Sequence, residues 1–297
     1  MENIFDILSQ FRIKYKLDEP LAMHTSVKVG GKAKFFAYVK TKKQLVELLI
    51  FLRNNGDIKY QILGNGTNVL ASDDGFDGFI ICTKKMKRYK VSKNNIFVQA
   101  GMGLFEFGKI LKNNGLAGLE FLYGIPGTIG GAIVMNAGAF EKNIGDYVDY
   151  VLAFCDGQVK KLKQKEMQFA YRKSIAQKKD IVILGAKFNL EFCEKTAIEN
   201  LQKEYLQKKT ISQPYDKLSF GSAFKRCEGK PISKIIDELG LKGLRIGGAE
   251  ISKKHAGFII NVGGATCQDF LEMIQYIQQK IYDAHGFIPE PEVKLLK

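Results

Sequence analysis

Two glycine-rich segments, about 60 residues apart, constrain this chain more than any other feature. The first covers residues 64–68 and follows the apolar run 60–63, and the second covers residues 124–131 and continues to Ala139. Glycine has no Cβ, so its backbone N–H groups can approach a ligand closely. Successive N–H groups, especially before a helix, form anion sites. Two such loops predict a ligand with two phosphates, held from two sides.

The common phosphate motifs are absent from both segments. The pattern Gly64-x-Gly66 has Val69 where a dinucleotide fingerprint has its third glycine, and no glycine loop ends in Gly-Lys-Ser/Thr. Either segment alone could be a tight turn. Together, with Thr and Asn donors among the glycines and little charge, they favour a binding site.

The composition indicates a globular protein of a reducing compartment. The chain has 297 residues and 45% hydrophobic residues, enough for two domains or one large one. The five cysteines are scattered without a CxxC pair, and the three histidines lie far apart. Neither a disulfide framework nor a metal site is expected. The N-terminus lacks signal-peptide features and no apolar run approaches ~18 residues, so we expect a cytoplasmic location and no membrane insertion.

The net charge of +14 raises the question of a nucleic-acid partner. The lysines, however, are spread along the whole chain, and the densest cluster, residues 84–88, lacks interleaved aromatic residues for stacking. We therefore expect no nucleic-acid partner. A lysine-rich surface would attract anionic substrates.

The hydrophobic pattern predicts alternating helices and strands in the first part of the chain. Thr41 caps a helix that ends near Gly56, between strands at 35–39 and 60–63. The pair Asp156-Gly157 predicts a hairpin of two strands. Further elements are expected as strands at 78–83, 96–100 and 181–190 and helices at 105–114 and 196–208.

After Gln213-Pro214, which breaks the preceding helix, the chain predicts a second compact part. Thr266 and Asp269 form a capping-box variant at the start of a long helix. A helix at 232–239 and strands at 257–262 and 293–296 complete this part.

Several long motifs, in order along essentially the whole chain, resemble the UDP-N-acetylenolpyruvoylglucosamine reductase family. Residues 64–78 resemble the first flavin loop of that family, and residues 124–139 resemble the second. The family's other signatures are matched by His24-Thr25-Ser26, Tyr171-Arg172-x-Ser174, Gly221-Ser222-x-Phe224-Lys225, residues 240–264 and Glu290-Pro291-Glu292-Val293.

The resemblance implies an α+β fold. It consists of a two-part FAD-binding domain of the vanillyl-alcohol-oxidase/PCMH type and a C-terminal α+β substrate-binding domain. The expected domains are residues 1–195, divided into two subdomains near residue 84, and residues 196–297, whose last strand returns to the active site. The short stretch between Arg172 and Ser222 is similar to the type II branch, which lacks an extra substrate-capping element.

The resemblance also implies an activity. FAD would be bound non-covalently, NADPH would be the co-substrate, and the enolpyruvyl ether of a UDP-sugar would be reduced to UDP-N-acetylmuramate for peptidoglycan synthesis. A monomer is expected. An alternative is a flavin oxidoreductase of the same fold acting on another substrate. A flavin-binding protein without this activity and a basic nucleic-acid binder are further alternatives.

The resemblance assigns roles to individual residues. Hydride addition to an enol ether conjugated to a carboxylate develops charge on C2 and the carboxylate, which calls for a proton donor and a cation. Ser222 would protonate C2, Arg172 would bind the carboxylate, and Glu292 would hydrogen-bond it. Substrate contacts are expected from Tyr171, Lys225 and Arg226. Cofactor contacts are expected from Gly64, Asn65, Gly66, Thr67, Asn68, Gly127, Thr128, Ile129, Gly130, Gly131, Asn136, Ala137 and Gly138.

One pair of residues departs from the family pattern. Where the family has Asn-Pro after the serine motif, this chain has Arg226-Cys227. The family's Asn contacts substrate, so its replacement puts that contact in question while leaving the serine in place.

Overall fold

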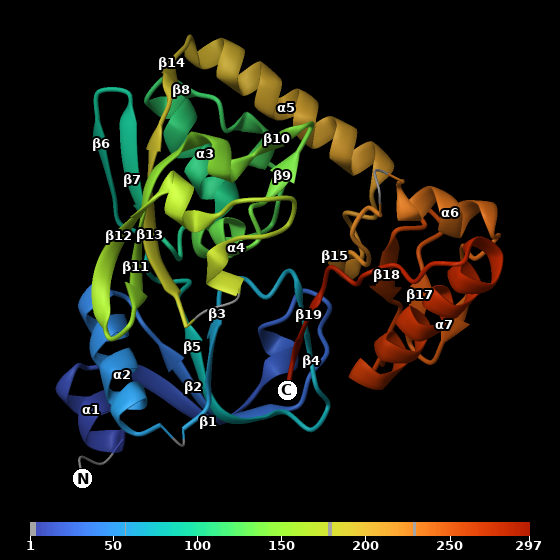
Figure 1. The fold of residues 1–297 in the computed structure, drawn as a ribbon, viewed down its shortest axis with the longest axis horizontal. Helices are drawn as coiled ribbons and strands as arrows, with labels where there is room; N and C mark the ends of the chain where they lie inside the picture. The colour runs from blue at the N-terminus through green and yellow to red at the C-terminus, as the bar shows by residue number, and fades with distance from the viewer. Residues whose placement is uncertain (1–3, 57, 178–179, 228–229) are drawn as a thin grey trace. The chain divides into compact units, whose positions relative to one another are not determined.

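The computed structural model describes residues 4–56, 58–177, 180–227 and 230–297. The chain forms two compact units, each assembled from separate stretches. The first unit comprises Met1–Leu17, Phe35–Asn65 and Gly78–Gln207, and the second comprises Asp18–Lys34, Gly66–Asp77 and Lys208–Lys297. Most helices and strands are labelled in Figure 1.

Most of a four-stranded sheet, with the strand order β1-β2-β5-β3, belongs to the first unit. Its strands and the helices beside it are α1 (Ile4–Gln10), β1 (Lys14–Pro20), β2 (Lys32–Tyr38), α2 (Lys42–Asn54), β3 (Tyr60–Leu63) and β5 (Phe76–Cys82). Strands β3 and β5 are parallel, with Tyr60 opposite Phe79. Helix α2 begins at the predicted cap, where Thr41 and Gln44 form a capping box. Its apolar face packs with Phe79 in a buried core.

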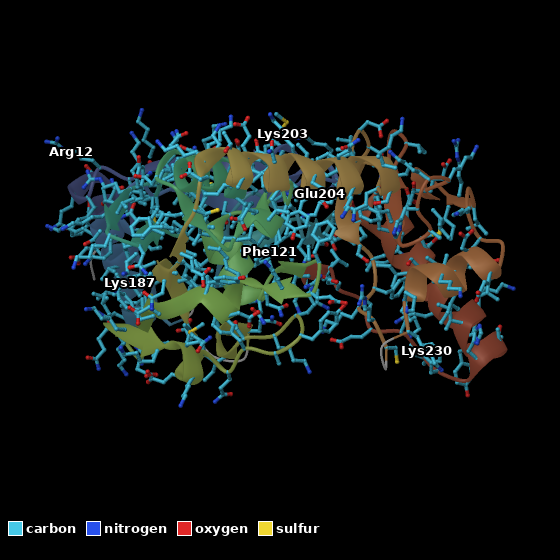
Figure 2. The ribbon with its side chains drawn as sticks, turned by 90° about the horizontal axis from the view of Figure 1, so that it is seen from above. Arg12, Phe121, Lys187, Lys203, Glu204 and Lys230 are labelled. Carbon is cyan, nitrogen blue, oxygen red and sulfur yellow. The ribbon has the colours of Figure 1, made fainter. Side chains whose placement is uncertain are left out.

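A five-stranded sheet in the order β12-β11-β13-β7-β6 forms the other part of the first unit. Its strands and the helices packed with them are β6 (Tyr89–Ser92), β7 (Asn95–Gln99), α3 (Leu104–Asn113), α4 (Ile129–Val134), β11 (Val148–Cys155), β12 (Gln158–Lys163) and β13 (Val182–Asn189). Strands β11 and β12 form the hairpin predicted from Asp156-Gly157, with Cys155 opposite Gln158. Phe121 is fully buried in this core, whereas Lys203 extends outward from α5 (Lys195–Ser212) (Figure 2).

Short elements connect these layers. Strand β8 (Leu116–Ala117) pairs with β14 (Glu191–Phe192), and β9 (Gly138–Ala139) pairs with β10 (Lys142–Asn143). The single-turn 3₁₀ helices are η1 (Leu21–Met23), η2 (Glu120–Leu122), η3 (Ile144–Tyr147), η4 (Gln164–Met167) and η5 (Ile175–Gln177).

The second unit contains an antiparallel sheet in the order β15-β18-β17-β16 and two helices. Its elements are β15 (Leu218–Ser222), α6 (Ile232–Glu238), β16 (Arg245–Ile246), β17 (Ala249–Ile251), β18 (Phe258–Asn261) and α7 (Cys267–His285). The last strand, β19 (Lys294–Leu296), pairs in parallel with β4 (Val69–Ala71). Helices and strands of both units give the predicted α+β fold class.

The N-terminus of α7 is held by three side chains. Thr266 and Asp269 form the predicted capping box. The amides of Thr266 and Gly248 donate to Asp269 and hold the pKa of its carboxyl below the ordinary value. The carboxylate of Asp73 accepts from the amides of Cys267 and Gln268 at 2.8 and 3.1 Å. A residue far away in the sequence therefore satisfies two amides that a helix leaves without internal partners.

The described residues contain no helix long and apolar enough to cross a membrane. The same part of the chain contains no group of His, Cys, Asp and Glu side chains that could hold a metal ion.

We expect Asp73→Ala to loosen the start of α7. Losing a carboxylate cap and its attraction to the helix N-terminus costs about 1 kcal/mol. Hydrogen exchange at the amides of Cys267 and Gln268 should accelerate about five-fold, as that free energy implies. Asp74→Ala is the matched control, because among the described residues the amides of α7 donate to Asp73 and none donates to the Asp74 carboxylate. Equal exchange in both variants would contradict the prediction.

Candidate active site

The first glycine segment begins where β3 ends, in direct contact with the second segment. A Cβ on Gly64 would lie 2.4 Å from the Thr128 hydroxyl oxygen, so only glycine fits there. The Asn65 side-chain amide donates to the carbonyl oxygens of Pro126 and Gly127 at 2.9 and 3.3 Å. Residues 64–65 and 126–128 therefore form one substructure of the first unit.

The second segment uses its backbone amides unequally. The N–H groups of Ile129 and Gly130 donate to the carbonyls of Met102 and Ala100 at 2.9 and 2.8 Å. A Cβ on Gly130 would meet the Cβ of Ala100 at 3.0 Å. Within the described part of the chain, the Gly131 amide donates only to the side chain of its own helix cap, Thr128, at 3.4 Å. Gly131 is exposed, and the nearest atom to an added Cβ is the Thr128 hydroxyl oxygen at 3.6 Å. Gly131 thus has open space in front of it, whereas Gly130 faces the protein.

Asn136 is buried, and its side chain binds the chain itself. Its amide nitrogen donates to Ala170 O at 3.0 Å, and its amide oxygen accepts from Gly145 N at 3.0 Å. The neighbouring Ala137 donates to Ala132 O at 2.8 Å. A Cβ on Gly138 would lie 2.4 Å from Asn143 Oδ1. These residues form a tightly held turn.

Arg172 lies on a turn in which Ala170 and Lys173 exchange backbone hydrogen bonds. Its φ of 53° is in the left-handed region, which costs a residue with a Cβ roughly 1–2 kcal/mol. Its guanidinium donates to Gly138 O at 3.3 Å and lies 5.1 Å from the centre of the exposed Tyr171 ring. Glycine or asparagine would suit this backbone better.

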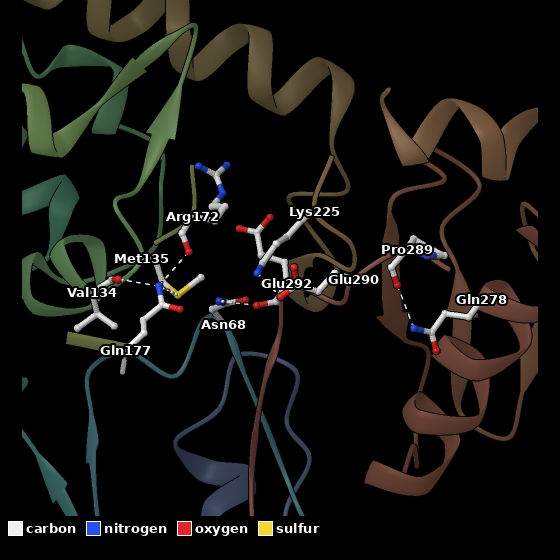
Figure 3. A network of polar contacts seen from close by, with 10 residues as sticks. All are labelled: Asn68, Val134, Met135, Arg172, Gln177, Lys225, Gln278, Pro289, Glu290 and Glu292. Carbon is white, nitrogen blue, oxygen red and sulfur yellow. Dashed lines mark hydrogen bonds and ion pairs between the residues drawn. The ribbon is translucent and has the colours of Figure 1, made fainter. Parts of the chain in front are cut away.

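Gln177 holds the backbone of Arg172. Its side-chain amide donates to the carbonyls of Arg172 and Val134 at 2.9 and 2.8 Å and contacts the sulfur of Met135 (Figure 3). Sequence reasoning missed this residue, because a lone glutamine carries no pattern.

The hairpin between β9 and β10 was also missed by sequence reasoning. Its two loop residues, Phe140 and Glu141, both have positive φ, 53° and 63°. Such loops favour Asn-Gly, and Phe-Glu gives no such signal. The Phe140 ring stacks on Tyr205 of α5, with centroids 4.2 Å apart.

In the second unit, the rest of the first glycine segment contacts the chain's last strand. Gly66 has φ +64°, and a Cβ there would lie 2.1 Å from His24 O. Thr67 follows in the turn, and the Asn68 side chain donates to Glu292 O at 3.1 Å (Figure 3). Lys294 N in turn donates to Asn68 O at 3.0 Å.

Ser222 and Glu292 lie on neighbouring extended segments. Glu292 N donates to Ala223 O at 2.9 Å, and Lys225 N donates to Glu290 O at 3.0 Å. The hydroxyl of Ser222 donates to Phe224 O at 3.2 Å. The structure therefore brings together the serine and the glutamate that the sequence singled out.

A histidine supports this strand pair from behind. Ala223 N donates to Gly257 O at 2.8 Å, and Gly257 N donates to Nδ1 of His255 at 3.1 Å. Burial lowers the pKa of His255, which favours the neutral ring that can accept this bond.

The two basic residues after Ser222 differ in environment. Lys225 is buried, with 6% of its surface exposed, and forms an ion pair with Glu290. Arg226 is exposed. The partner Glu290 was assigned no role from the sequence, because the pairing depends on the strand register.

The comparisons with known proteins first define a class. Residues 33–163 match the FAD binding domain family, and residues 213–296 match the family described as UDP-N-acetylenolpyruvoylglucosamine reductase, C-terminal domain. The class is that of FAD-dependent oxidoreductases.

Relatives along the whole chain define the family. A UDP-N-acetylenolpyruvoylglucosamine reductase of Caldicellulosiruptor saccharolyticus is 38% identical over 97% of this chain and 94% of its own. That of Caldanaerobacter subterraneus subsp. tengcongensis is 40% identical over 95% and 94%. The crystal structure of UDP-N-acetylenolpyruvylglucosamine reductase from Thermus caldophilus has a TM-score of 0.82 and 31% identity, covering 96% of this chain and 99% of that one. The chain belongs to the UDP-N-acetylenolpyruvoylglucosamine reductase family.

The predicted family and FAD-binding fold are thereby confirmed, and the alternative substrate is not favoured. The first unit also fits the cofactor on its own geometry. Asn65 joins residues 64–65 to the second segment, and Gly131, whose amide donates to the Thr128 hydroxyl at 3.4 Å, is exposed beside them. Backbone N–H groups of glycine-rich turns can form the kind of anion site that a diphosphate occupies.

We expect neighbouring glycine substitutions to have opposite consequences. Gly131→Val should leave the unfolding temperature nearly unchanged but reduce flavin content, because its side chain would occupy the open space. Gly130→Val should lower the unfolding temperature, because its side chain would press on Ala100. The measurements are flavin absorbance per protein and thermal unfolding.

Gly56→Val is the control, since an added Cβ there would meet nothing within 4 Å. Full flavin content in Gly131→Val would show that residue 131 does not face the cofactor.

Proposed function

We propose that this chain reduces UDP-N-acetylenolpyruvoylglucosamine to UDP-N-acetylmuramate, a precursor of peptidoglycan. NADPH is the reductant and FAD is bound non-covalently. The observation that carries the proposal is the pairing of Ala223 with Glu292, which sets Ser222 and Glu292 on adjoining segments. A small-molecule UDP-sugar and NADPH are the ligands, and we propose a cytoplasmic monomer with no nucleic-acid partner.

The cofactor residues are proposed from both glycine segments. FAD, when bound, supplies the hydride acceptor and donor that links NADPH to the enolpyruvyl group. Asn65 holds the carbonyls of Pro126 and Gly127, so that the segments keep a fixed spacing. The amides of Ile129 and Gly130 are engaged by the protein, and these two residues support the segment from behind.

Ser222 is the proposed proton donor to C2 of the substrate. Its hydroxyl now donates to Phe224 O, and a change of χ1 rotamer would free the proton for a ligand. Glu292 hydrogen-bonds the carboxyl group of the substrate. Its backbone is fixed by bonds to Ala223 and Asn68, which limits the movement of its side chain.

Arg172 binds the substrate carboxylate. A guanidinium presents two parallel donors to two carboxylate oxygens and stabilises charge that develops there. Tyr171 lies against the guanidinium and limits its motion. The guanidinium is thus held in place before substrate binds, although the left-handed backbone of Arg172 is energetically unfavourable.

Lys225 and Arg226 are the proposed contacts to the substrate's pyrophosphate. Both side chains carry a positive charge that attracts a pyrophosphate; Lys225 is also paired with Glu290, and Arg226 is exposed. The proposed domains are residues 1–195, in two subdomains divided near residue 84, which hold FAD and also contain Arg172 and Tyr171, and residues 196–297, which bind the UDP-sugar.

We expect Ser222→Ala to spare flavin reduction by NADPH and to slow reoxidation by the enolpyruvyl substrate. Loss of a general acid costs ~10²–10⁴-fold, and the hydroxyl acts only when C2 is protonated. Stopped-flow absorbance of the two half-reactions measures both rates. Ser219→Ala, on the same strand β15, is the control. Equal slowing of both half-reactions would refute a role for Ser222 in proton donation.

We expect Arg226→Asn to raise the KM for the UDP-sugar several-fold with little change in kcat. A pyrophosphate remote from the reacting carbon is bound equally in the ground and transition states. The dependence of KM on salt should also weaken. Arg226→Lys keeps the charge and should retain most of the affinity. An unchanged KM in Arg226→Asn would leave pyrophosphate binding to Lys225.

A further inference from the structure

We infer that Phe140 is a positioning residue for the proposed reaction. Its ring, stacked on Tyr205, fixes the β9–β10 hairpin, and the carbonyl of Gly138 in that hairpin orients the guanidinium of Arg172. The inference rests on the proposed function, because it concerns how Arg172 meets the substrate carboxylate.

The hairpin needs an anchor from outside itself. Only two residue pairs form its stem, Ala139 with Lys142 and Gly138 with Asn143. A hairpin this short is not stable alone, and its two loop residues both have positive φ. The ring planes of Phe140 and Tyr205 are 18° apart at 4.2 Å, a close stacked contact. Tyr205 itself packs against the large core of the first unit.

The Phe140 ring is linked to Arg172 through the backbone of Ala139 and Gly138. Gly138 leads into the loop, and its carbonyl accepts from Arg172 Nη2 at 3.3 Å. The backbone of Arg172 is held separately by Gln177. The hairpin therefore acts on the guanidinium end of the side chain. The ring of Tyr171 also lies near the guanidinium, but a cation–π contact fixes the direction of its N–H groups less than a hydrogen bond does.

The residue type at position 140 supports this role. A loop with positive φ at both positions favours asparagine and glycine, and a phenylalanine there is strained. The ring is half-exposed and lies on the same short hairpin as the carbonyl that meets Arg172. Strain at Phe140, on the hairpin whose Gly138 carbonyl meets Arg172, motivates the hypothesis that the Phe140 side chain has a role there.

The variant Phe140→Asn removes the ring without adding backbone strain, because asparagine tolerates positive φ better than phenylalanine. It therefore tests the effect of the ring alone. We expect the unfolding temperature to stay within a few degrees of the parent and flavin reduction by NADPH to be unchanged. Reoxidation by the enolpyruvyl substrate should slow roughly ten-fold, and the Kd of that substrate for the oxidised enzyme should rise by a similar factor, as expected for a misoriented binding group.

Two single variants serve as controls. Phe140→Tyr keeps an aromatic ring at this position and should show the parent rates of flavin reduction and reoxidation. Phe192→Asn makes the same change at an exposed phenylalanine of β14, where no effect is expected. In an Arg172→Ala background, Phe140→Asn should cause no further loss, because the ring acts through the arginine.

The outcomes separate this inference from the proposed function. Parent-like reoxidation and Kd in Phe140→Asn, with strong impairment in Arg172→Ala, would overturn the inference and leave the function standing. A further loss in the Arg172→Ala background, or loss of flavin in Phe140→Asn, would also overturn it. A parent-like substrate half-reaction in Arg172→Ala would overturn the proposed role of Arg172 together with the inference.

Discussion

The missing Cβ at Gly64 allows the most consequential contact of the first unit. The Thr128 hydroxyl occupies the space that any other residue at position 64 would fill. Because the two loops meet there, Asn65 can bind the carbonyls of Pro126 and Gly127. Thr128 also caps α4, so that its position determines where the following glycines face. In this arrangement Gly130 packs against Ala100, whereas Gly131 has open space beside it.

In the second unit, candidate site residues are positioned by the pairing of segments that are distant in the sequence. Residues 223–225 lie beside residues 290–292 through two backbone hydrogen bonds, and Asn68 joins the latter from a third stretch of chain. Backbone hydrogen bonds fix positions more narrowly than exposed side-chain contacts, which lose more conformational freedom on ordering. The Ser222 hydroxyl and the Glu292 carboxyl are thus placed by strand register. The ion pair of Lys225 with Glu290 is a product of the same register.

The sequence predicted the features that depend on local chemistry. The cap at Thr41, the hairpin at Asp156-Gly157 and the capping box at Thr266 all appear at the expected residues. The roles proposed for Arg172 and Ser222 came from resemblance to a family, since neither residue carries a local signal. Features set by tertiary structure were missed: the left-handed backbone of Arg172, the Phe140–Glu141 loop and the buried Lys225. In each case a distant contact overrides the local preference of the residue.

The composition of the second unit from three separated stretches has a consequence for synthesis. All residues of the first unit have been made once the chain reaches Gln207. The second unit needs β19, at residues 294–296, to pair with β4 near residue 70. Chains grow at about 5–20 residues per second, so residues 18–34 and 66–77 wait many seconds for their partners. During that interval the apolar side chains of Val27, Val29 and Leu70, which are buried in the finished core, lack that cover. The order of synthesis therefore leaves the apolar side chains of these early stretches without their native partners until the last strand has been made.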